Sequence, residues 1–411
     1  MTDEREVVIT GMGAVSAYGR GVDILWDGLV AGRSTIARIS GFDPAPYACQ
    51  VAGEVRGYEP HPDVPPELAA RLDRGALFAV DAALQALADS GLPLTPENAV
   101  QVGAVVGSAR PGESSVWQGQ RAFREQGPQA LTGGYIGRTL ANSSAIQAAS
   151  AIGARGPTIA VSAGGASGDA ALALAANMVR RGEVEVAIAG GADAAITPPA
   201  LAAFCAMTLL TEHNDDPPRA CRPFDAEGDG FALGEGAGML VLENEELARE
   251  RGARVYARLS GAASITEPGV LLPTAPEAGR ALQAALREPA LLQSEIDYFC
   301  AYAPGTPQLD RLETEAIKRI FGELTASKLT ISAPKSMLGH ALGAGGAFEA
   351  IVCAKAIETG VVPPTINFER AAEGCDLDYT PNEARQQQVR HALSYAIGFG
   401  GHHVALCFSA P

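Results

Sequence analysis

Basic side chains are scarce in this sequence. Its 411 residues contain 31 Lys and Arg against 47 Asp and Glu, which gives a formal net charge of -16 and an isoelectric point near 4.9. The lysines are Lys318, Lys328, Lys335 and Lys355. Such a chain repels nucleic-acid phosphates and anionic lipid headgroups. We therefore expect neither a nucleic acid nor a membrane surface among its partners.

Long apolar runs and a leader segment are also missing. The longest uncharged apolar stretch, Ala194 to Thr211, is interrupted by Pro198 and Pro199, whereas a membrane span needs about twenty mostly apolar residues. The N-terminal MTDEREVVITG has no apolar core of the kind that a secretory signal requires. With 47% hydrophobic and 19% charged residues, the chain can bury a large core. We expect a cytoplasmic globular protein.

Paired cysteines are absent as well. The seven cysteines are an odd number and show no CxxC spacing, so the sequence suggests neither a disulfide framework nor a zinc site. We expect reduced and mostly buried thiols at Cys49, Cys205, Cys221, Cys300, Cys353, Cys375 and Cys407.

Two short motifs superficially suggest a bound cofactor. The segment GMGAVS follows a strand-like run, but Ser16 stands where a dinucleotide-binding loop has its third glycine. His402 and His403 are neighbours just before a predicted strand, where successive side chains point to opposite faces and are poorly placed to share a metal. We therefore expect no nucleotide, no metal and no other cofactor.

Short β-rich runs alternate with longer helical stretches along the whole chain, which indicates an α/β protein. The order of elements in the first half is repeated in the second. The segments Thr158–Ala176 and Leu329–Ala354 both predict a strand, a Gly/Ser loop and a helix of small residues. Small residues allow close approach on every side, so we expect these helices to be buried at the centre between two similar halves, residues 1–250 and 251–411.

Four stretches carry the most information: VSAGGASG (161–168), GDGFALGEGAGMLVLE (228–243), APKSMLGHALGAGGAFEA (333–350) and YAIGFGGHH (395–403). Together they resemble the β-ketoacyl synthase, or ketosynthase, branch of the thiolase superfamily. The resemblance runs in order along essentially the full chain. It implies a five-layered αβαβα thiolase fold, a tight dimer, and decarboxylative Claisen condensation on acyl-carrier-protein thioesters.

The resemblance also shows which parts of the catalytic site are missing. Ketosynthases carry a cysteine nucleophile in a motif like STACA, and Gly165 of SAGGA takes its place. Tyr302 occupies the position at which the family has its first catalytic histidine, and its phenol is a poor proton acceptor at pH 7. The other positions of the family's site are present. The motif KSMLGH supplies Lys335 and His340, the acid beyond it is Glu349, and GFGG supplies Phe399. Cys205 and Cys300 are poor substitutes for the nucleophile because neither has an adjacent base in its motif.

A ketosynthase-like chain without its nucleophile resembles the chain length factor of a type II polyketide synthase. That resemblance implies a heterodimer with a catalytic ketosynthase, whose acyl tunnel this chain completes, and contact with acyl carrier protein mainly through the partner. The usual replacement for the cysteine is glutamine, so glycine is a departure. The candidate residues that limit tunnel depth are Trp117, Gln118, Arg121, Phe123 and Tyr135. These residues are equally compatible with simple packing of a dimer helix.

Two other functions remain open. One is a priming decarboxylase that converts malonyl carrier protein to the acetyl form with His340, Lys335 and the backbone N–H groups of Gly165 and Phe399. The other is a catalytically silent homodimer with a scaffolding or ligand-binding role. In both, as in the chain length factor, the chain alone is not expected to condense acyl groups.

Overall fold

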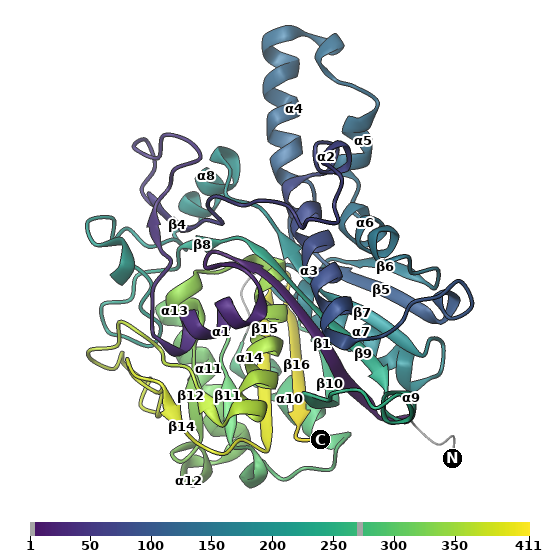
Figure 1. Cartoon of the computed structure of the whole chain (residues 1–411). Coiled ribbons are helices and arrows are strands. Elements are labelled where there is room, and N and C mark those ends of the chain that lie inside the picture. The colour runs from purple at the N-terminus through teal and green to yellow at the C-terminus, as the bar shows by residue number, and fades with distance from the viewer. Residues whose placement is uncertain (1–4, 269–273) are drawn as a thin grey trace.

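A computed structural model describes residues 5–268 and 274–411 of the chain (Figure 1). Within these residues, an eleven-stranded sheet has the order β12-β11-β15-β16-β10-β1-β9-β7-β5-β6, with β2 paired to β1 at the side. Its strands are β1 (Val7–Ser16), β2 (Gly19–Arg20), β5 (Val102–Gly107), β6 (Thr158–Val161), β7 (Val186–Asp193), β9 (Gly236–Asn244), β10 (Ala257–Thr266), β11 (Tyr298–Cys300), β12 (Thr330–Ser332), β15 (His391–Gly398) and β16 (His402–Ser409).

The sheet consists of two halves with the same strand order. The first half runs β6-β5-β7-β9-β1 and the second runs β12-β11-β15-β16-β10. In each half the first three strands are parallel and the last three are antiparallel. The halves meet where β1 pairs with β10, with Val8 opposite Arg258. The predicted repetition of elements is therefore confirmed.

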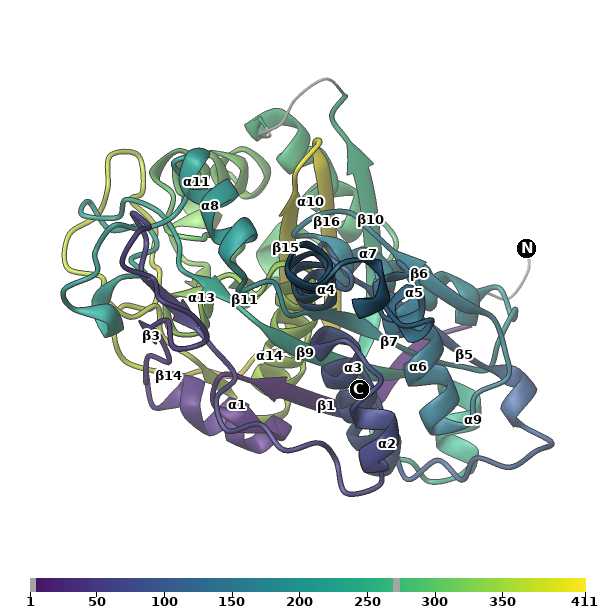
Figure 2. The same ribbon diagram turned by 90° about the horizontal axis from the view of Figure 1, so that it is seen from above.

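Helices fill the three remaining layers (Figures 1 and 2). One outer layer, α3 and α6, covers the first half, and the other, α10 and α11, covers the second. Between the halves lie α7 and α14, which contact each other and strands of both halves. This is the five-layered thiolase-type fold that the sequence predicts. The bounds of these helices are α3 (Arg74–Ser90), α6 (Ser143–Ile152), α7 (Ser167–Arg180), α10 (Ala275–Arg287), α11 (Pro307–Phe321) and α14 (Gly345–Thr359).

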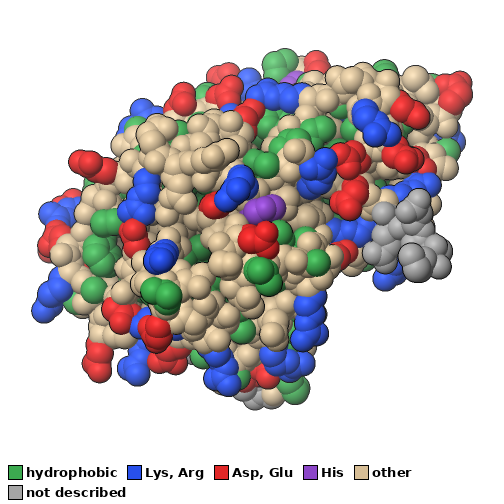
Figure 3. All heavy atoms as spheres, turned by 90° about the horizontal axis from the view of Figure 1, so that it is seen from below, with side chains coloured by type: hydrophobic (Ala, Val, Ile, Leu, Met, Phe, Trp, Pro, Cys, Tyr) green, Lys and Arg blue, Asp and Glu red, His purple; other side chains and the backbone are tan. Residues whose placement is uncertain are grey.

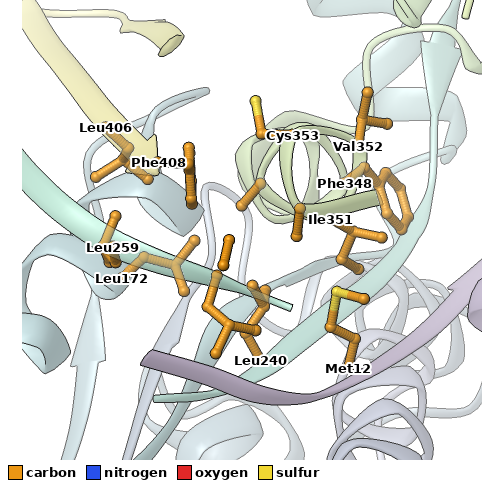
Figure 4. Close-up of a cluster of buried hydrophobic side chains, with 14 of the residues drawn as sticks. Met12, Leu172, Leu240, Leu259, Phe348, Ile351, Val352, Cys353, Leu406 and Phe408 are labelled. Carbon is orange, nitrogen blue, oxygen red and sulfur yellow. The ribbon is translucent and has the colours of Figure 1, made fainter. Parts of the chain in front are cut away.

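The central helices can lie so close because glycines stand at the contact points. A Cβ atom at Gly168 of α7 would lie 2.6 Å from the carbonyl oxygen of Gly343, just before α14. Larger side chains then fill the space around this contact. Figure 4 shows Phe348 and Ile351 of α14 facing Met12 and Leu240 of the first half-sheet. The expected burial of both central helices is thus confirmed.

The GMGAVS segment lies inside β1 and not in a loop. Gly11 and Gly13 let the strand pack directly on α3, since a Cβ atom at Gly13 would overlap the carbonyl oxygen of Ala82. Helix α3 begins where the Asp73 carboxylate accepts the Gly75 N–H at 2.9 Å and ends at Gly91, whose φ is 60°. Gly11 and Gly13 therefore allow β1 to pack closely against α3.

A helical arm projects from the body of the molecule (Figure 1). It consists of α4 (Glu113–Gln126), η2 (Pro128–Ala130) and α5 (Gly134–Thr139). The Tyr135 ring packs directly on Gly119, where a Cβ atom would overlap it. On the outside, Phe123 is 47% exposed and Ile136 is 65% exposed. The arm therefore presents apolar surface that the chain itself does not cover.

Shorter elements complete the chain. A small sheet joins β3, β4 and β8, and β13 pairs with β14. No helix in the described ranges is both long and apolar enough to cross a membrane. The remaining bounds are α1 (Val22–Val30), β3 (Ala37–Arg38), β4 (Val51–Gly53), α2 (Pro66–Ala69), η1 (Ala99–Gln101), α8 (Pro198–Ala206), η3 (Pro217–Arg219), β8 (Leu233–Gly234), α9 (Glu245–Glu250), η4 (Gln293–Glu295), α12 (Glu323–Ala326), α13 (Lys335–Leu338), η5 (Leu342–Ala344), β13 (Val361–Val362) and β14 (Arg385–Gln386).

The contact between β1 and α3 yields a stability prediction. Gly13→Ala should lower the free energy of unfolding by about 3 kcal/mol, because the new methyl group must displace the backbone of α3. Gly137→Ala in α5 is the matched control, since a Cβ atom there meets nothing within 4 Å and alanine favours the helix. Urea unfolding measures both. Equal stability of the two variants would contradict the proposed contact.

Candidate functional site

A cavity of about 290 Å³ opens where the two halves meet beside α8. Its wall is mostly apolar, and its polar groups are few: the imidazole of His340, the hydroxyl of Tyr302 and the guanidinium of Arg110, together with backbone at Gly164 and Gly165. The apolar wall includes Ala203, Phe204, Met207, Leu209, Phe231 and Ile397. Such a cavity suits an apolar ligand with one polar end.

Gly165 lies in the turn between β6 and α7, at the wall of this cavity. A Cβ atom at this position would lie 2.8 Å from the carbonyl oxygen of Ile397 and 3.1 Å from Nε2 of His340. Any side chain at position 165 would therefore start beside the imidazole. Gly164, whose φ is +57°, supplies the left-handed turn that aims the position inward. The turn thus points position 165 at the imidazole, but its approach to the Ile397 carbonyl leaves room for glycine and not for a larger residue without a shift of the backbone.

Tyr302 follows β11 and faces the cavity, a point that the sequence left open. Its hydroxyl lies 3.2 Å from Nε2 of His340, and the two rings meet edge to face at 88°. Burial raises the pKa of the Tyr302 phenol, and the nearby Glu349 and Glu313 raise it further. The phenol therefore stays protonated at neutral pH and acts here as a hydrogen-bonding group, not as a base.

His340 stands at the end of the loop that follows α13. The imidazole is 3% exposed, and among the described residues no group bonds to its Nδ1 atom. Burial lowers the pKa of His340 well below 6.5, and the charge of Lys335 lowers it further. The ring is consequently neutral at pH 7. Its Nε2 atom is the one that a ligand in the cavity would reach, and Tyr302 already contacts it.

Lys335 is close to His340 but does not line the cavity. Its ammonium group forms a buried ion pair with Glu349, and both side chains are at most 5% exposed. The Lys335 Nζ atom also lies 4.6 Å from the centroid of the Tyr302 ring, which is a cation–π distance. The positive charge is thus neutralised within the protein and is not presented to the cavity.

Three more buried carboxyl groups surround this single lysine. Burial raises the pKa of Asp169 to about 7, of Glu313 to about 7 and of Asp310 to about 8, and Lys335 opposes each shift. Two backbone N–H groups, those of Tyr302 and Ala303, donate to Glu313 at 2.8 Å. One cation cannot neutralise four carboxylates, so part of this cluster holds protons near neutral pH.

Asp193, the last residue of β7, connects the cavity wall to the base of the arm. Its carboxylate is buried and accepts four hydrogen bonds: from the Ser108 hydroxyl at 2.7 Å and from the N–H groups of Ala109, Arg110 and Gly343 at 2.8, 3.0 and 2.7 Å. The loop that carries His340 and the loop that leads into α4 therefore share one anchor. The sequence analysis did not single out Asp193.

Asp169 was also missed by the sequence reasoning. It lies in the first turn of α7, and its carboxyl group sits against Gly346 of α14 where the central helices cross. The hydroxyl of Ser394 donates to one oxygen at 3.2 Å, and the other oxygen has no partner among the described residues. The sequence signal that could have revealed Asp169 is an acidic residue within an alanine-rich helix.

The structure separates the remaining predicted residues into two groups. Phe399 lines the cavity from the turn between β15 and β16, with its ring 6.3 Å from that of Phe204. The five predicted tunnel residues all belong to the arm and line no part of the cavity. Gln118, Arg121 and Phe123 are exposed, and Trp117 and Tyr135 are half-buried.

The cysteines add no nucleophile to this cavity. All seven lie in the described residues and are free thiols, six of them buried. Cys300 is fully buried in β11, and Cys205 is half-buried in α8 but is not among the residues that line the cavity.

Comparison with known proteins identifies the family. Residues 4–248 match the family described as Beta-ketoacyl synthase, N-terminal domain, and residues 256–369 match the one described as Beta-ketoacyl synthase, C-terminal domain. The chain therefore belongs to the β-ketoacyl synthase family.

Relatives of two kinds support this assignment. The 3-oxoacyl-[acyl-carrier-protein] synthase 2 of Vibrio harveyi is 36% identical over 98% of both chains. A Streptomyces halstedii protein named for polyketide β-ketoacyl synthase activity is 39% identical over 99% of this chain and 98% of its own. A solved chain described as the ishigamide ketosynthase/chain length factor superposes with a TM-score of 0.92 at 32% identity, covering 99% of this chain and 100% of its own.

The buried acids yield a prediction about pH. The folded-state pKa of Asp169, about 7, lies above its usual 3.8, so the stability that its protonated form contributes is full below about pH 4 and is lost as the pH rises through 7. Asp169→Asn removes this titration. As the pH is raised from 5 to 8, the melting temperature of the variant should therefore fall by less than that of the wild type. Circular dichroism measures both melting temperatures.

Asp193→Asn is the matched control for a buried aspartate. The amide loses acceptors for donors that the carboxylate satisfies, so this variant should be less stable than the wild type by about 3 kcal/mol at pH 8. Burial also raises the pKa of Asp193, so this variant controls for the loss of a buried aspartate and not for the pH dependence. A wild-type and an Asp169→Asn protein with the same pH dependence would contradict the assignment of a proton to Asp169.

Proposed function

We propose that this protein is a chain length factor, the non-acylated subunit that pairs with a catalytic ketosynthase of a type II polyketide synthase. The observation that carries the proposal is the turn at Gly165, which aims position 165 at Nε2 of His340 with no side chain to acylate. The cavity and the fold are kept while the nucleophile is missing. Condensation would then take place on the partner, with this chain completing the partner's acyl tunnel.

The surroundings of His340 support this function over malonyl decarboxylation. A decarboxylase has to stabilise the negative charge that develops on the substrate carbonyl. Here the Lys335 charge is neutralised by Glu349, and the Tyr302 hydroxyl contacts the Nε2 atom of His340. The charge of Lys335 is therefore not available to a thioester in the cavity, and a thioester that reaches His340 has to compete with Tyr302 for Nε2.

The arm and the edge of the sheet support a partner chain of the same fold. Strand β6 is the edge of the first half-sheet, bonded on one side to β5, and all four of its residues are half-buried. The apolar outer face of the arm, Phe123, Ile136 and Leu140, is open in the single chain. An unpaired edge beside apolar surface is a typical subunit interface. The similar ishigamide chain comes from a ketosynthase/chain length factor.

Charge at the cavity mouth supports docking of acyl carrier protein mainly on the partner. Arg110 is the charged residue that lines the cavity, and it is paired with Glu113 at 2.8 Å. On the one face shown in Figure 3, basic and acidic side chains are interspersed. We further propose that residues 1–250 and 251–411 are the two halves of one compact unit.

The association itself is the first prediction of this proposal. Native mass spectrometry of the tagged protein from its source should find the 42.3 kDa chain in a one-to-one complex with a second chain of similar mass that carries an acylatable cysteine. Phe123→Asp on the arm should weaken that complex, whereas Leu324→Asp, an exposed leucine of α12, should not. A homodimer, or turnover of malonyl carrier protein by the isolated chain, would contradict the proposal.

The tunnel role yields a separate prediction. Trp117→Ala should lengthen the product of the reconstituted heterodimer, because a large ring on α4 no longer occupies the end of the tunnel. Liquid chromatography with mass detection measures the product distribution, with Leu324→Ala as the control. An unchanged distribution would leave Trp117 with a packing role in the dimer helix.

A further inference from the structure

A second buried polar cluster lies about the turn that carries Phe399. Tyr395 of β15 and His403 of β16 are both fully buried, and the Tyr395 hydroxyl lies 2.6 Å from Nδ1 of His403. On the other side of the ring, Nε2 of His403 lies 3.4 Å from a carboxylate oxygen of Glu267, just beyond the end of β10. The imidazole thus lies between a phenol, at hydrogen-bond distance, and a carboxylate, at ion-pair distance.

The geometry assigns the neutral tautomer of His403. The Glu267 carboxylate can only accept, so the proton of the ring belongs on Nε2, facing Glu267. Nδ1 then accepts the proton of the Tyr395 hydroxyl. Protonation of the ring would place a second hydrogen on Nδ1, facing the hydroxyl. The Tyr395 donor would lose its acceptor in a fully buried place.

This cluster holds one side of the turn that carries Phe399. The turn, residues 399–401, contains Gly400 and Gly401 with φ of +87° and +80°. The N–H group of Glu267 donates to the Gly401 carbonyl at 2.7 Å. Glu267 therefore touches the turn through its backbone and His403 through its side chain. The Phe399 ring, on the same turn, lines the cavity.

Other charged groups near His403 are few. Glu277 of α10 and His402 on the same strand are its other titratable neighbours, and Glu267 also accepts the N–H and hydroxyl of Thr274 at 2.8 Å. Burial raises the pKa of Tyr395, and Glu313 and Tyr302 on the cavity side raise it further. Burial lowers the pKa of His403 below 6.5, while Glu267 opposes this shift. His403 is therefore neutral at pH 7 and becomes protonated in acid.

We propose that Tyr395, His403 and Glu267 form a pH-sensitive latch that holds the Phe399 turn in place at neutral pH and releases it when His403 is protonated. The turn forms part of the cavity wall, so release changes access to the cavity. The latch does not depend on whether the chain is a chain length factor. It also explains the His402–His403 pair without a metal, since only His403 points into the cluster.

Hydrogen exchange followed by mass spectrometry tests the latch in the full chain. Amides of residues 399–402 should exchange several-fold faster at pH 5 than at pH 7.5, after correction for intrinsic rates, relative to amides of β1 as an internal reference. His403→Asn should show no such acid response. His402→Asn is the matched control and should respond like the wild type.

Glu267→Gln distinguishes a latch from a purely structural cluster. It removes the charge that favours protonated His403, so the acid response should remain but move to lower pH. This variant also decides the matter if His403→Asn does not fold. The proposal is overturned if the wild type shows no acid response in the turn, if His403→Asn retains it, or if Glu267→Gln leaves its pH unchanged.

Discussion

The close approach of the two central helices is the constraint on which the rest of this structure depends. The helices α7 and α14 meet over glycine backbone at Gly168 and Gly343, and both half-sheets pack against this contact. The turns that precede the two helices carry Gly165 and His340, so the distance between the helices also sets the distance between these residues. A site built in this way keeps its geometry as long as the core is packed. Loss of the nucleophile therefore need not disturb the cavity.

The electrostatics of the site follow from the same burial. One ammonium group, that of Lys335, lies among four buried carboxyl groups. Some of these carboxyl groups are therefore protonated near neutral pH, and the charge of Lys335 is neutralised inside the protein. Lys335 is not among the residues that line the cavity, and its ammonium group lies 4.6 Å from the centroid of the Tyr302 ring, whereas the imidazole of His340 does line the cavity.

The layers and the central helices could be predicted from the sequence because they depend on local patterns. Alternating runs give strands, and the small residues of 167–180 and 345–359 give buried helices. The positions of Gly165 and His340 followed from motif order. The four bonds of Asp193 and the cluster of Tyr395, His403 and Glu267 could not be predicted, since the directions of these side chains depend on loop geometry and strand register. Tyr302 shows the same limit, because one residue of slip would turn it away from His340.

The separation between the arm and the cavity bears most directly on function. Every predicted tunnel residue lies on α4 or α5, and none of them is among the residues that line the cavity of this chain. The cavity, in turn, is joined to the base of the arm through Asp193. The arm is anchored to the site through Asp193. The polar groups of the site therefore have a structural role that does not require a nucleophile. They fix the loop from which the arm departs, and the arm carries apolar side chains that are exposed in the single chain.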